Sequence, residues 1–378
     1  MIVEPSGRVV VFGATGFTGE LVARALIDRG VEPVLAGRRA DALHQLRERL
    51  GRGEVRVADA DRPETVRALV DRGDVLATTV GPFARYGEAA VAAAVERGAH
   101  YLDPAGEGQF VRRVLTVYGP LAREAGVALL PAFGFESVPG NLAAALALES
   151  APVEPTTVEV LYVCDPRVSS GGTRASAADV VLERAFAYRD GRVVERRVAA
   201  RNRLFEVAGR RIRGLSIPSS EHLTLPRSFP QLRDVEVYLG GFGVLTGPLR
   251  VVAAVGARMG EASALRRLAT TVNRRFFPSS TGGPDPDRRA KTTTYLVARA
   301  YRDDQRVSEV TLAGPDPYRL TADFFAWAIR SILDGGLRRA GGLGPCEAFG
   351  TAELAAAAEQ MGLRPLGTDH LDKHGSRS

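Results

Sequence analysis

A glycine-rich turn near the start of the chain constrains the fold more than any other sequence feature. The turn GATGFTG follows the apolar, β-branched run 9–12 and precedes a helical pattern over 20–29. Glycines at such a turn let the backbone approach a pyrophosphate, whose charge is stabilised by the free amides of the helix N-terminus. A tight turn of purely structural use is the alternative, but the surrounding strand and helix favour a dinucleotide site formed by Gly13, Ala14, Thr15, Gly16, Phe17, Thr18 and Gly19.

The segments after this turn repeat the alternation of strand and helix. Short apolar runs recur up to residue 130 with helical patterns between them. Helical crossovers return the chain to the same end of a sheet, so the strands should be parallel. We predict an α/β fold with an N-terminal Rossmann-type, doubly wound parallel sheet, whose strands are 9–12, 33–36, 55–57, 75–79, 100–102 and 127–130.

The end of the second predicted strand indicates which dinucleotide is bound. A carboxylate there would bond the ribose 2′-hydroxyl of NAD and repel a 2′-phosphate. The chain has Gly37, Arg38 and Arg39 at this point and no Asp or Glu from 33 to 39. Guanidinium groups hold phosphates with a fork of donors, so we predict NADP(H) as the cofactor. The alternative is that both arginines merely begin a solvated helix.

Two further segments are predicted to line the cofactor. Asp59 follows the third strand, where it would lie beside the adenine or cap a helix, and the sequence leaves both roles open. The fourth strand runs into Val80, Gly81 and Pro82. Glycine permits a close approach here, and proline redirects the chain over the ribose and nicotinamide.

The pattern changes near Pro139, where the first domain is expected to end. A Leu- and Ala-rich helix over 142–149 cannot continue through Pro152 and Pro155. We therefore predict a dinucleotide-binding domain over 1–135 and a second, mixed α+β domain over 136–340. Its expected strands are 157–164, 235–240, 249–254, 292–301 and 306–313, and the Pro-, Gly- and Asp-rich stretch 278–289 is expected to be a loop.

Composition excludes several classes of function. The net charge is +6, but the arginines are spread along the chain without a recognition motif, so no nucleic-acid partner is expected. Cys164 and Cys346 are far apart and predict neither a disulfide nor a metal site. Apolar runs fall far below the roughly 20 residues of a membrane span, and no leader pattern precedes the first strand, so we expect a cytoplasmic protein without integral membrane association.

Three segments together resemble saccharopine dehydrogenase-like oxidoreductases. They are GATGFTG at 13–19, TTVGPFARYGEAAVAAAVERGAHYLDPAGE at 78–107 and PAFGFESVPGNLA at 131–143. Weaker matches at 170–173 and 314–318 extend the likeness over most of the chain. Within the family, the sequence looks most similar to the bacterial branch that includes trans-acting enoyl reductases. It lacks a long hydrophobic insertion associated with some of those, which leaves an enoyl substrate open.

The resemblance implies a Rossmann domain, a second domain with an open sheet, and a last segment, 341–378, that returns to pack on the first domain. We expect an NADPH-dependent oxidoreductase that reduces a C=N, C=C or C=O bond of a metabolic or secondary-metabolic intermediate. Its partner would be a small-molecule or carrier-bound substrate, and a homodimer stays open. A non-catalytic NADP-binding regulator is one alternative. An NAD-dependent amine transfer of the homospermidine type is another, against which Arg38 and Arg39 argue.

Residues at the carboxyl ends of the strands should line the reaction cleft. Tyr86 is a candidate proton donor, or else a helix-start residue that packs on the sheet. Glu136 lies where apolar neighbours would raise its pKa towards that of a general acid, or it caps a helix that begins at Gly140. Asp103 is also expected in the cleft, and substrate contacts are expected from Phe83, Glu107, Phe135, Ser137, Gly172 and Thr173.

Two common dehydrogenase chemistries do not fit the sequence. A Tyr-x-x-x-Lys pair is absent, because Asp287 and Asp369 stand four positions before the two lysines, Lys291 and Lys373. The two cysteines and five histidines show no ligand spacing for zinc, so no metal is expected.

Overall fold

A parallel sheet forms the base of the first domain. The computed structural model describes residues 2–5, 7–164, 185–243 and 283–366. The strands of this sheet are β1 (Val9–Phe12), β2 (Pro33–Gly37), β3 (Glu54–Val57), β4 (Val75–Thr78), β5 (His100–Leu102), β6 (Ala128–Leu130) and β15 (Gly341–Gly342). They lie in the order β15-β6-β5-β4-β1-β2-β3, and each neighbouring pair is parallel. The prediction of a doubly wound parallel sheet is confirmed.

Helices cover both faces of this sheet, which is why all four residues of β1 are buried. Val9 and Val11 face the same core as α1 (Phe17–Asp28) and α2 (Ala40–Leu50). Alternate strand residues point to the opposite side. There they share a core with α3 (Pro63–Arg67) and α4 (Phe83–Arg97). Between β5 and β6 the chain forms α5 (Gly108–Arg113), a π-helical turn (Val114–Tyr118) and α6 (Gly119–Ala125).

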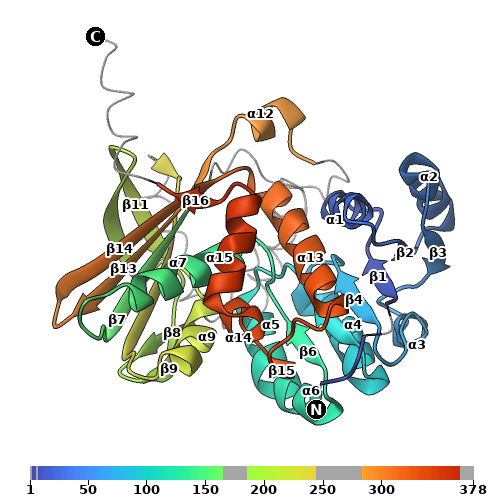
Figure 1. Ribbon diagram of the computed structural model, residues 1–378, viewed down its shortest axis with the longest axis horizontal. Helices are drawn as coiled ribbons and strands as arrows, with labels where there is room; N and C mark the ends of the chain where they lie inside the picture. The colour runs from blue at the N-terminus through green and yellow to red at the C-terminus, as the bar shows by residue number, and fades with distance from the viewer. Residues whose placement is uncertain (1, 6, 165–184, 244–282, 367–378) are drawn as a thin grey trace, which may run out of the picture.

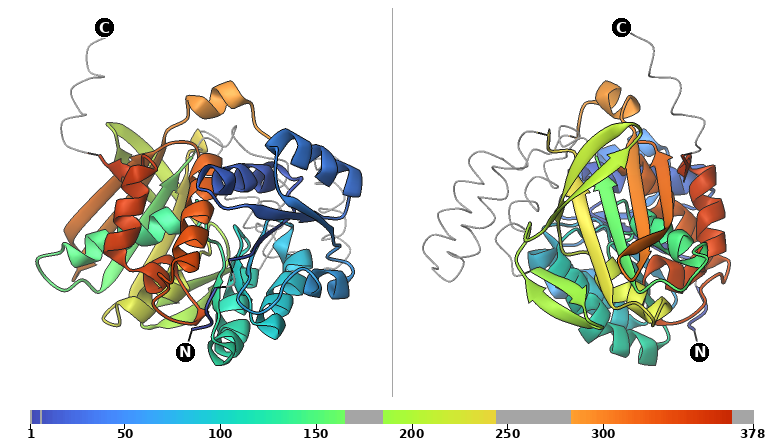
Figure 2. Two further views of the ribbon diagram at one scale, coloured as in Figure 1. Left: turned by 45° about the vertical axis from the view of Figure 1, so that its right-hand side comes forward. Right: turned by 90° about the vertical axis from the view of Figure 1, so that its left-hand side faces the viewer.

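A larger mixed sheet forms the second domain (Figures 1 and 2). The strands run in the order β10-β11-β12-β7-β13-β14-β16, and β8 pairs with β12 and β9. β12 and β7 are parallel, whereas the other pairs are antiparallel. Their bounds are β7 (Thr157–Val163), β8 (Ala185–Arg189), β9 (Arg192–Arg196), β10 (Asn202–Val207), β11 (Arg210–Ser216), β12 (Asp234–Gly240), β13 (Thr294–Arg302), β14 (Gln305–Gly314) and β16 (Arg364–Pro365).

One hydrophobic core connects the two sheets. Val9 of the first sheet and Val158 of the second belong to the same cluster of buried side chains. α7 (Val138–Glu149) packs on the second sheet, and α13 (Pro317–Leu333) packs against α1 (Figure 1). The other helices of this part are α9 (Glu221–Ser228), α12 (Pro286–Ala290), α14 (Pro345–Phe349) and α15 (Thr351–Gln360).

The end of the chain contacts both sheets rather than the first alone. β15 extends the first sheet beside β6. α14 and α15 then pack against α7, and β16 pairs with β14 of the second sheet. None of the helices in the described ranges combines the length and apolar character that crossing a membrane would need.

Three details of the predicted elements are wrong. The helix expected over 142–149 begins four residues earlier, because the N-terminal turn of α7 accommodates Pro139 at its second position. The end of the expected loop, from residue 286, belongs to α12, whose N-terminus is capped by Asp285. The hairpins formed by β8 to β11 were not expected. The strand expected at 249–254 lies outside the described residues.

Candidate active site

The glycine turn connects β1 to α1 and leaves no room for side chains at two positions. Gly13 has a φ of +90°, and a Cβ there would lie 2.7 Å from Thr79 Oγ1. A Cβ on Gly19 would lie 2.2 Å from the Gly13 carbonyl oxygen, so only glycine lets helix and strand approach this closely. These two glycines therefore serve the fold of the turn.

Gly16 stands apart from the other two glycines. It is exposed, its φ of −80° suits any residue, and a Cβ would have only the Gly13 carbonyl oxygen within 4 Å, at 3.2 Å. Gly16 is the N-cap of α1, and no side chain among the described residues caps this helix end. Uncapped amides at a helix N-terminus form a site for phosphate, so the turn fits the pyrophosphate of a dinucleotide.

The two arginines expected to favour NADP(H) over NAD follow the end of β2. Arg38 and Arg39 are exposed, and Arg39 is the N-cap of α2. Neither guanidinium group has a hydrogen bond or ion pair to another described residue, so both are available to a ligand. Gly37 precedes them, and a Cβ there would lie 4.0 Å from Thr15 Oγ1, which places the arginines beside the glycine turn.

Asp59 follows β3 and makes local bonds. Its Oδ1 accepts a hydrogen bond from Asp61 N at 3.1 Å, and its own N–H donates to Thr65 Oγ1 at 2.9 Å. The helix that follows, α3, has Arg62 rather than Asp59 as its N-cap. Asp59 thus shapes the turn before α3, and its contact with an adenine stays a prediction.

The end of β4 packs directly on the glycine turn. Thr79 N donates to the Phe12 carbonyl at 2.8 Å, and Thr79 Oγ1 donates to the Gly13 carbonyl at 3.1 Å. Val80 and the exposed Gly81 follow, and Pro82 is the N-cap of α4. The segment predicted to cover the ribose and nicotinamide therefore lies beside the segment predicted to hold the pyrophosphate.

Glu107 joins this loop to the end of β5. Its side chain is only 1% exposed, and Oε1 accepts a hydrogen bond from Phe83 N, the first amide of α4, at 3.0 Å. A carboxylate at this place is stabilised by the positive end of the helix. Glu107 therefore fixes the start of α4, while its predicted contact with a substrate stays a prediction.

A second buried acid, Asp103, lies in the same loop. Its Oδ1 accepts hydrogen bonds from Ala105 N at 2.7 Å and Ala132 N at 3.0 Å, and burial raises its pKa to about 6. These bonds tie the segment after β5 to the segment after β6. Asp103 therefore fixes Ala132, which precedes the next predicted residue, Glu136, in the same segment.

Glu136 is the residue whose environment best suits acid catalysis. Its Oε2 is buried and has no hydrogen-bond partner in the described part of the chain. Burial raises the pKa of Glu136 to about 7, and the negative charges of Glu107 and Asp103 add to this. Near neutral pH its carboxyl group is thus present in substantial amounts as the acid, the form that can donate a proton.

The expected role of Glu136 as a cap is wrong. α7 begins at Val138, and Ser137 is its N-cap. Ser137 is itself fully buried, and its hydroxyl forms a hydrogen bond with that of Ser220. Glu136 precedes this cap, and its carboxyl group does not cap α7.

The structure places the remaining predicted residues in different surroundings. The Phe83 ring is buried against Phe110, with centroids 5.7 Å apart, and Phe135 packs edge-on against Tyr162 at 5.7 Å. Tyr86 is half-buried in the first turn of α4, where the Arg85 guanidinium lies 4.6 Å from its ring centroid. Gly172 and Thr173 lie outside the described residues, as does the rest of the turn 170–173.

Sequence reasoning missed a buried polar cluster behind Ser137. Glu221 is completely buried and accepts hydrogen bonds from the hydroxyls of Tyr162, Ser219 and Ser220. Asn141 Nδ2 donates to the Ser137 carbonyl at 3.0 Å, and Thr224 Oγ1 donates to Asn141 Oδ1 at 2.8 Å. The run Ser219-Ser220-Glu221 before a helix is a signal that sequence analysis can use, but it resembles an ordinary cap.

The decisive comparison concerns the first domain. Residues 9–130 match the family model described as the saccharopine dehydrogenase NADP binding domain. The first domain is thus similar to the NADP-binding domain of saccharopine dehydrogenases. The resemblance drawn from the three sequence segments is thereby confirmed, as is the expected NADP-binding type of domain.

Two mycobacterial relatives match part of the chain. A trans-acting enoyl reductase of Mycobacterium leprae is 36% identical over 186 residues, and one of Mycobacterium tuberculosis is 39% identical over 140 residues. These matches cover 46% and 35% of this chain, and the chain spans only 44% and 34% of those relatives' lengths.

Solved structures support the fold over nearly the whole chain. Saccharopine dehydrogenase (L-Glu forming) of Saccharomyces cerevisiae has a TM-score of 0.60 at 11% identity and covers 95% of this chain and 98% of its own. The homospermidine synthase of Legionella pneumophila, solved with NAD, has a TM-score of 0.56 at 10% identity, with 97% and 93% covered. At these identities the likeness concerns the fold alone.

The glycine turn gives a test that separates binding from folding. Gly16→Val should leave the circular dichroism spectrum unchanged but weaken NADPH binding at least tenfold, because its side chain occupies the space expected for the pyrophosphate. Gly19→Ala is the matched control for a structural glycine. Its Cβ meets the Gly13 carbonyl, so we expect a loss of stability of about 1 to 3 kcal/mol in urea unfolding. Wild-type NADPH affinity in a folded Gly16→Val protein would contradict this placement of the cofactor.

Proposed function

We propose that this protein is an NADPH-dependent reductase and that its substrate carries a carbon–carbon double bond conjugated to a carbonyl group. The observation that carries the proposal is Glu136, a half-buried acid with a buried Oε2 and a pKa of about 7. It lies beside the segment after β5, where a Cβ on Gly106 would be 3.7 Å from its Cγ. A reductase of this kind needs a hydride donor and a proton donor in one cleft. The first domain supports the former and Glu136 the latter.

The cofactor would be held by three segments. The amides at the start of α1 face the pyrophosphate, Arg38 and Arg39 hold the 2′-phosphate, and the loop from Val80 to Pro82 contacts the ribose and nicotinamide. When bound there, NADPH supplies a hydride. The chain itself must then orient the substrate and provide the proton.

Glu136 is suited to deliver that proton. Its acid form is favoured because the charged form would be buried beside two other carboxyl groups, Asp103 and Glu107. Once negative charge develops on a reduced substrate, the proton on the Glu136 carboxyl group can neutralise it. Asp103 and Glu107 are held by backbone amides, so they position the loops and keep the pKa of Glu136 high.

The need for a proton donor favours an enoyl or carbonyl substrate over an iminium. A cationic iminium is neutralised when it accepts hydride and requires no further proton, whereas a conjugated double bond yields an enolate that must be protonated. The mycobacterial relatives named trans-acting enoyl reductases support the conjugated double bond. A thioester of an unsaturated acid, free or on a carrier, is therefore the proposed substrate class.

The cofactor preference can be measured directly. NADPH should bind more tightly than NADH in a fluorescence titration, because two guanidinium groups face the 2′-phosphate. Charge-assisted bonds contribute about 1.5 to 3 kcal/mol, so replacing both Arg38 and Arg39 by Ala should weaken NADPH binding about tenfold or more and leave NADH binding nearly unchanged. Arg47→Ala, an exposed arginine later in α2, is the control and should have no effect. Equal wild-type affinities for both cofactors would refute the assignment.

The proton donor can be tested with a short 2-enoyl thioester. Glu136→Gln and Tyr86→Phe retain the shape of the side chain but remove its acidic proton. The variant that lacks the proton donor should turn over about 10²- to 10⁴-fold more slowly, with its NADPH affinity preserved. Because Glu136 acts as an acid with a pKa of about 7, the wild-type rate should fall as the pH rises through 7. This fall should disappear in Glu136→Gln. Glu124→Gln, an exposed residue of α6, is the control. Near wild-type turnover in both variants would show that the proton comes from elsewhere.

A further inference from the structure

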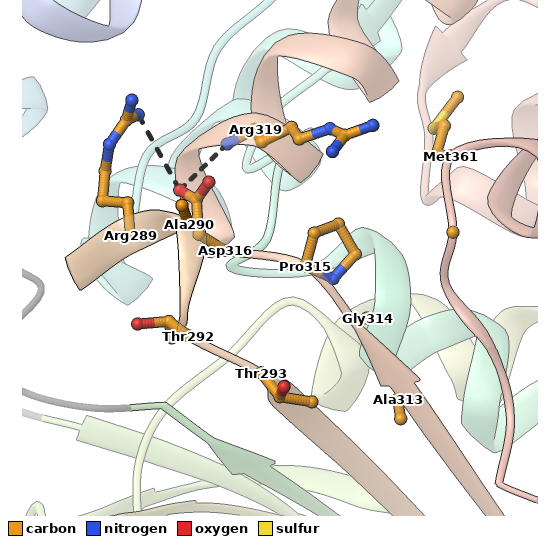
Figure 3. Close-up of a pocket in the computed structure, with 11 residues that line it drawn as sticks. Arg289, Ala290, Thr292, Thr293, Ala313, Gly314, Pro315, Asp316, Arg319 and Met361 are labelled. Atoms are coloured by element: carbon orange, nitrogen blue, oxygen red, sulfur yellow. Dashed lines mark hydrogen bonds and ion pairs between the residues drawn. The ribbon is translucent and has the colours of Figure 1, made fainter. Parts of the chain in front are cut away.

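Figure 3 shows a pocket of about 590 Å³ whose lining includes none of the residues of the proposed mechanism. It opens between α12, the start of α13 and the adjoining ends of β13 and β14. Its polar lining residues are Arg289, Thr292, Thr293, Asp316 and Arg319, and we call it the guanidinium pocket. The turn Gly314-Pro315-Asp316, singled out in the sequence but unused by the proposed mechanism, forms one of its walls.

The pocket has more positive than negative charge. Asp316 is occupied by the backbone, because its Oδ1 accepts hydrogen bonds from Tyr318 N at 3.0 Å and Arg319 N at 3.2 Å. Arg289 lies 3.9 Å from the same oxygen, which is too long for a hydrogen bond. The Arg319 side chain is 65% exposed, and its Nε lies 3.6 Å from Asp323 Oδ2. The lining thus contributes two guanidinium groups, of Arg289 and Arg319, and one carboxylate, of Asp316.

Arg289 has donor capacity that the described residues do not use. Its side chain is 18% exposed, and its Nε is buried without a hydrogen-bond partner in ranges 2–5, 7–164, 185–243 and 283–366. A guanidinium group carries five N–H donors in a planar fork that matches a carboxylate or a phosphate. An oxyanion between Arg289 and Arg319 would satisfy these donors and balance the charge.

The rest of the lining is apolar. Ala290, Ala313, Pro315 and Met361 contribute to the wall beside the two arginines. Ligand pockets of this size commonly combine an apolar lining with a few polar groups that fix orientation. We propose that the guanidinium pocket binds a small organic acid, with its carboxylate or phosphate held by Arg289 and Arg319 and a short apolar body against Pro315 and Met361.

The pocket is also connected to the dinucleotide turn. The Arg289 guanidinium lies 5.1 Å from the ring centroid of Phe17, the first residue of α1. The Phe17 ring packs edge-on against Tyr318, two residues after the Asp316 cap, at 5.1 Å. A ligand that binds the Arg289 guanidinium therefore alters the contact between Arg289 and Phe17 of the turn. We therefore expect binding in the pocket to be coupled to NADPH binding, an expectation that, unlike the pocket itself, rests on the proposed function. By reciprocity, the pocket ligand and NADPH should alter each other's affinity by the same factor.

Methionine methyl groups provide a local probe of binding. The chain has three methionines, Met1, Met259 and Met361, and Met361 is the methionine among the described residues that line the pocket. With ¹³C-methyl methionine, titration with hexanoate should shift the Met361 signal to saturation and leave the Met1 signal in place. Inorganic phosphate tests the oxyanion alone, and hexanoate should bind more tightly because its chain contacts the apolar wall.

Variants identify the groups responsible. Arg319→Gln should weaken hexanoate binding at least fivefold, Arg319→Lys should retain most of it, and Arg330→Gln, an exposed arginine farther along α13, should change nothing. Arg289→Gln should weaken hexanoate binding and also alter NADPH affinity. An unmoved Met361 signal at 10 mM hexanoate, on the order of ten times a millimolar Kd, would overturn the pocket proposal.

The NADPH arm separates the two possible sources of the oxyanion. If NADPH alone produces the hexanoate shift at Met361 and excludes hexanoate, the pocket belongs to the dinucleotide site and the proposal of a separate ligand is wrong. If both bind together with altered affinities, the pocket and its coupling stand. If both bind with unaltered affinities, the coupling fails and the pocket stands. Should NADPH not bind at all, the proposed function fails, while the hexanoate shift still decides the pocket.

Discussion

The hydrogen bond from the Phe83 amide to the Glu107 carboxylate holds the candidate site together. It joins the start of α4 to the segment after β5 at 3.0 Å, in a region closed to water. Asp103 extends the same arrangement to the segment after β6 through Ala132. Two buried carboxyl groups thus align three loops at one edge of the sheet. Their charges also disfavour ionisation of Glu136, so the groups that fix the geometry of the site help to determine its acid chemistry.

The second domain supports this edge through a shared core rather than a flexible link. α13 packs on α1, and Thr321 of α13 accepts a hydrogen bond from Phe135 N at 3.0 Å, next to Glu136. Tyr162 of β7 packs on the Phe135 ring from the other sheet. The turn that carries Glu136 therefore receives contacts from α13 and from the second sheet. A substrate bound between them would meet a proton donor whose position depends on the packing of the two domains.

The first domain could be predicted from sequence because its signals are local. β-branched runs mark the strands, and the glycine turn requires a strand before it and a helix after it. The environment of Glu136 was also predictable, since aromatic and proline residues surround it in the sequence. That Ser137 rather than Glu136 is the N-cap of α7 could not be predicted. The hydroxyl of Ser137 also bonds to that of Ser220, more than eighty positions away, a partner that no local pattern indicates.

The hairpins from β8 to β11 could not be predicted from the sequence because of their charged residues. They are rich in arginine, which in isolation indicates a solvated surface. In the fold, Arg189, Arg196 and Arg201 converge on the buried Glu236 of β12 at 3.0, 2.8 and 3.3 Å. The arginine charges that make these strands look like a solvated surface are neutralised only after the sheet forms. Their partner, Glu236, lies in β12, outside the hairpins, so the hairpin sequences alone do not reveal it. The cluster around Glu221 depends in the same way on distant residues such as Tyr162.

The central claim is that Glu136 carries a proton at neutral pH within a dinucleotide-binding cleft. The most direct test is a ¹³C NMR titration of the glutamate carboxyl groups, in which the Glu136 signal is identified by its absence from Glu136→Gln. The account predicts a midpoint near 7 for this signal, since burial and two neighbouring carboxyl groups favour the acid form. A midpoint close to the ordinary value of 4.5 would mean that Glu136 is ionised at neutral pH, and the proposed proton donor would have to be abandoned.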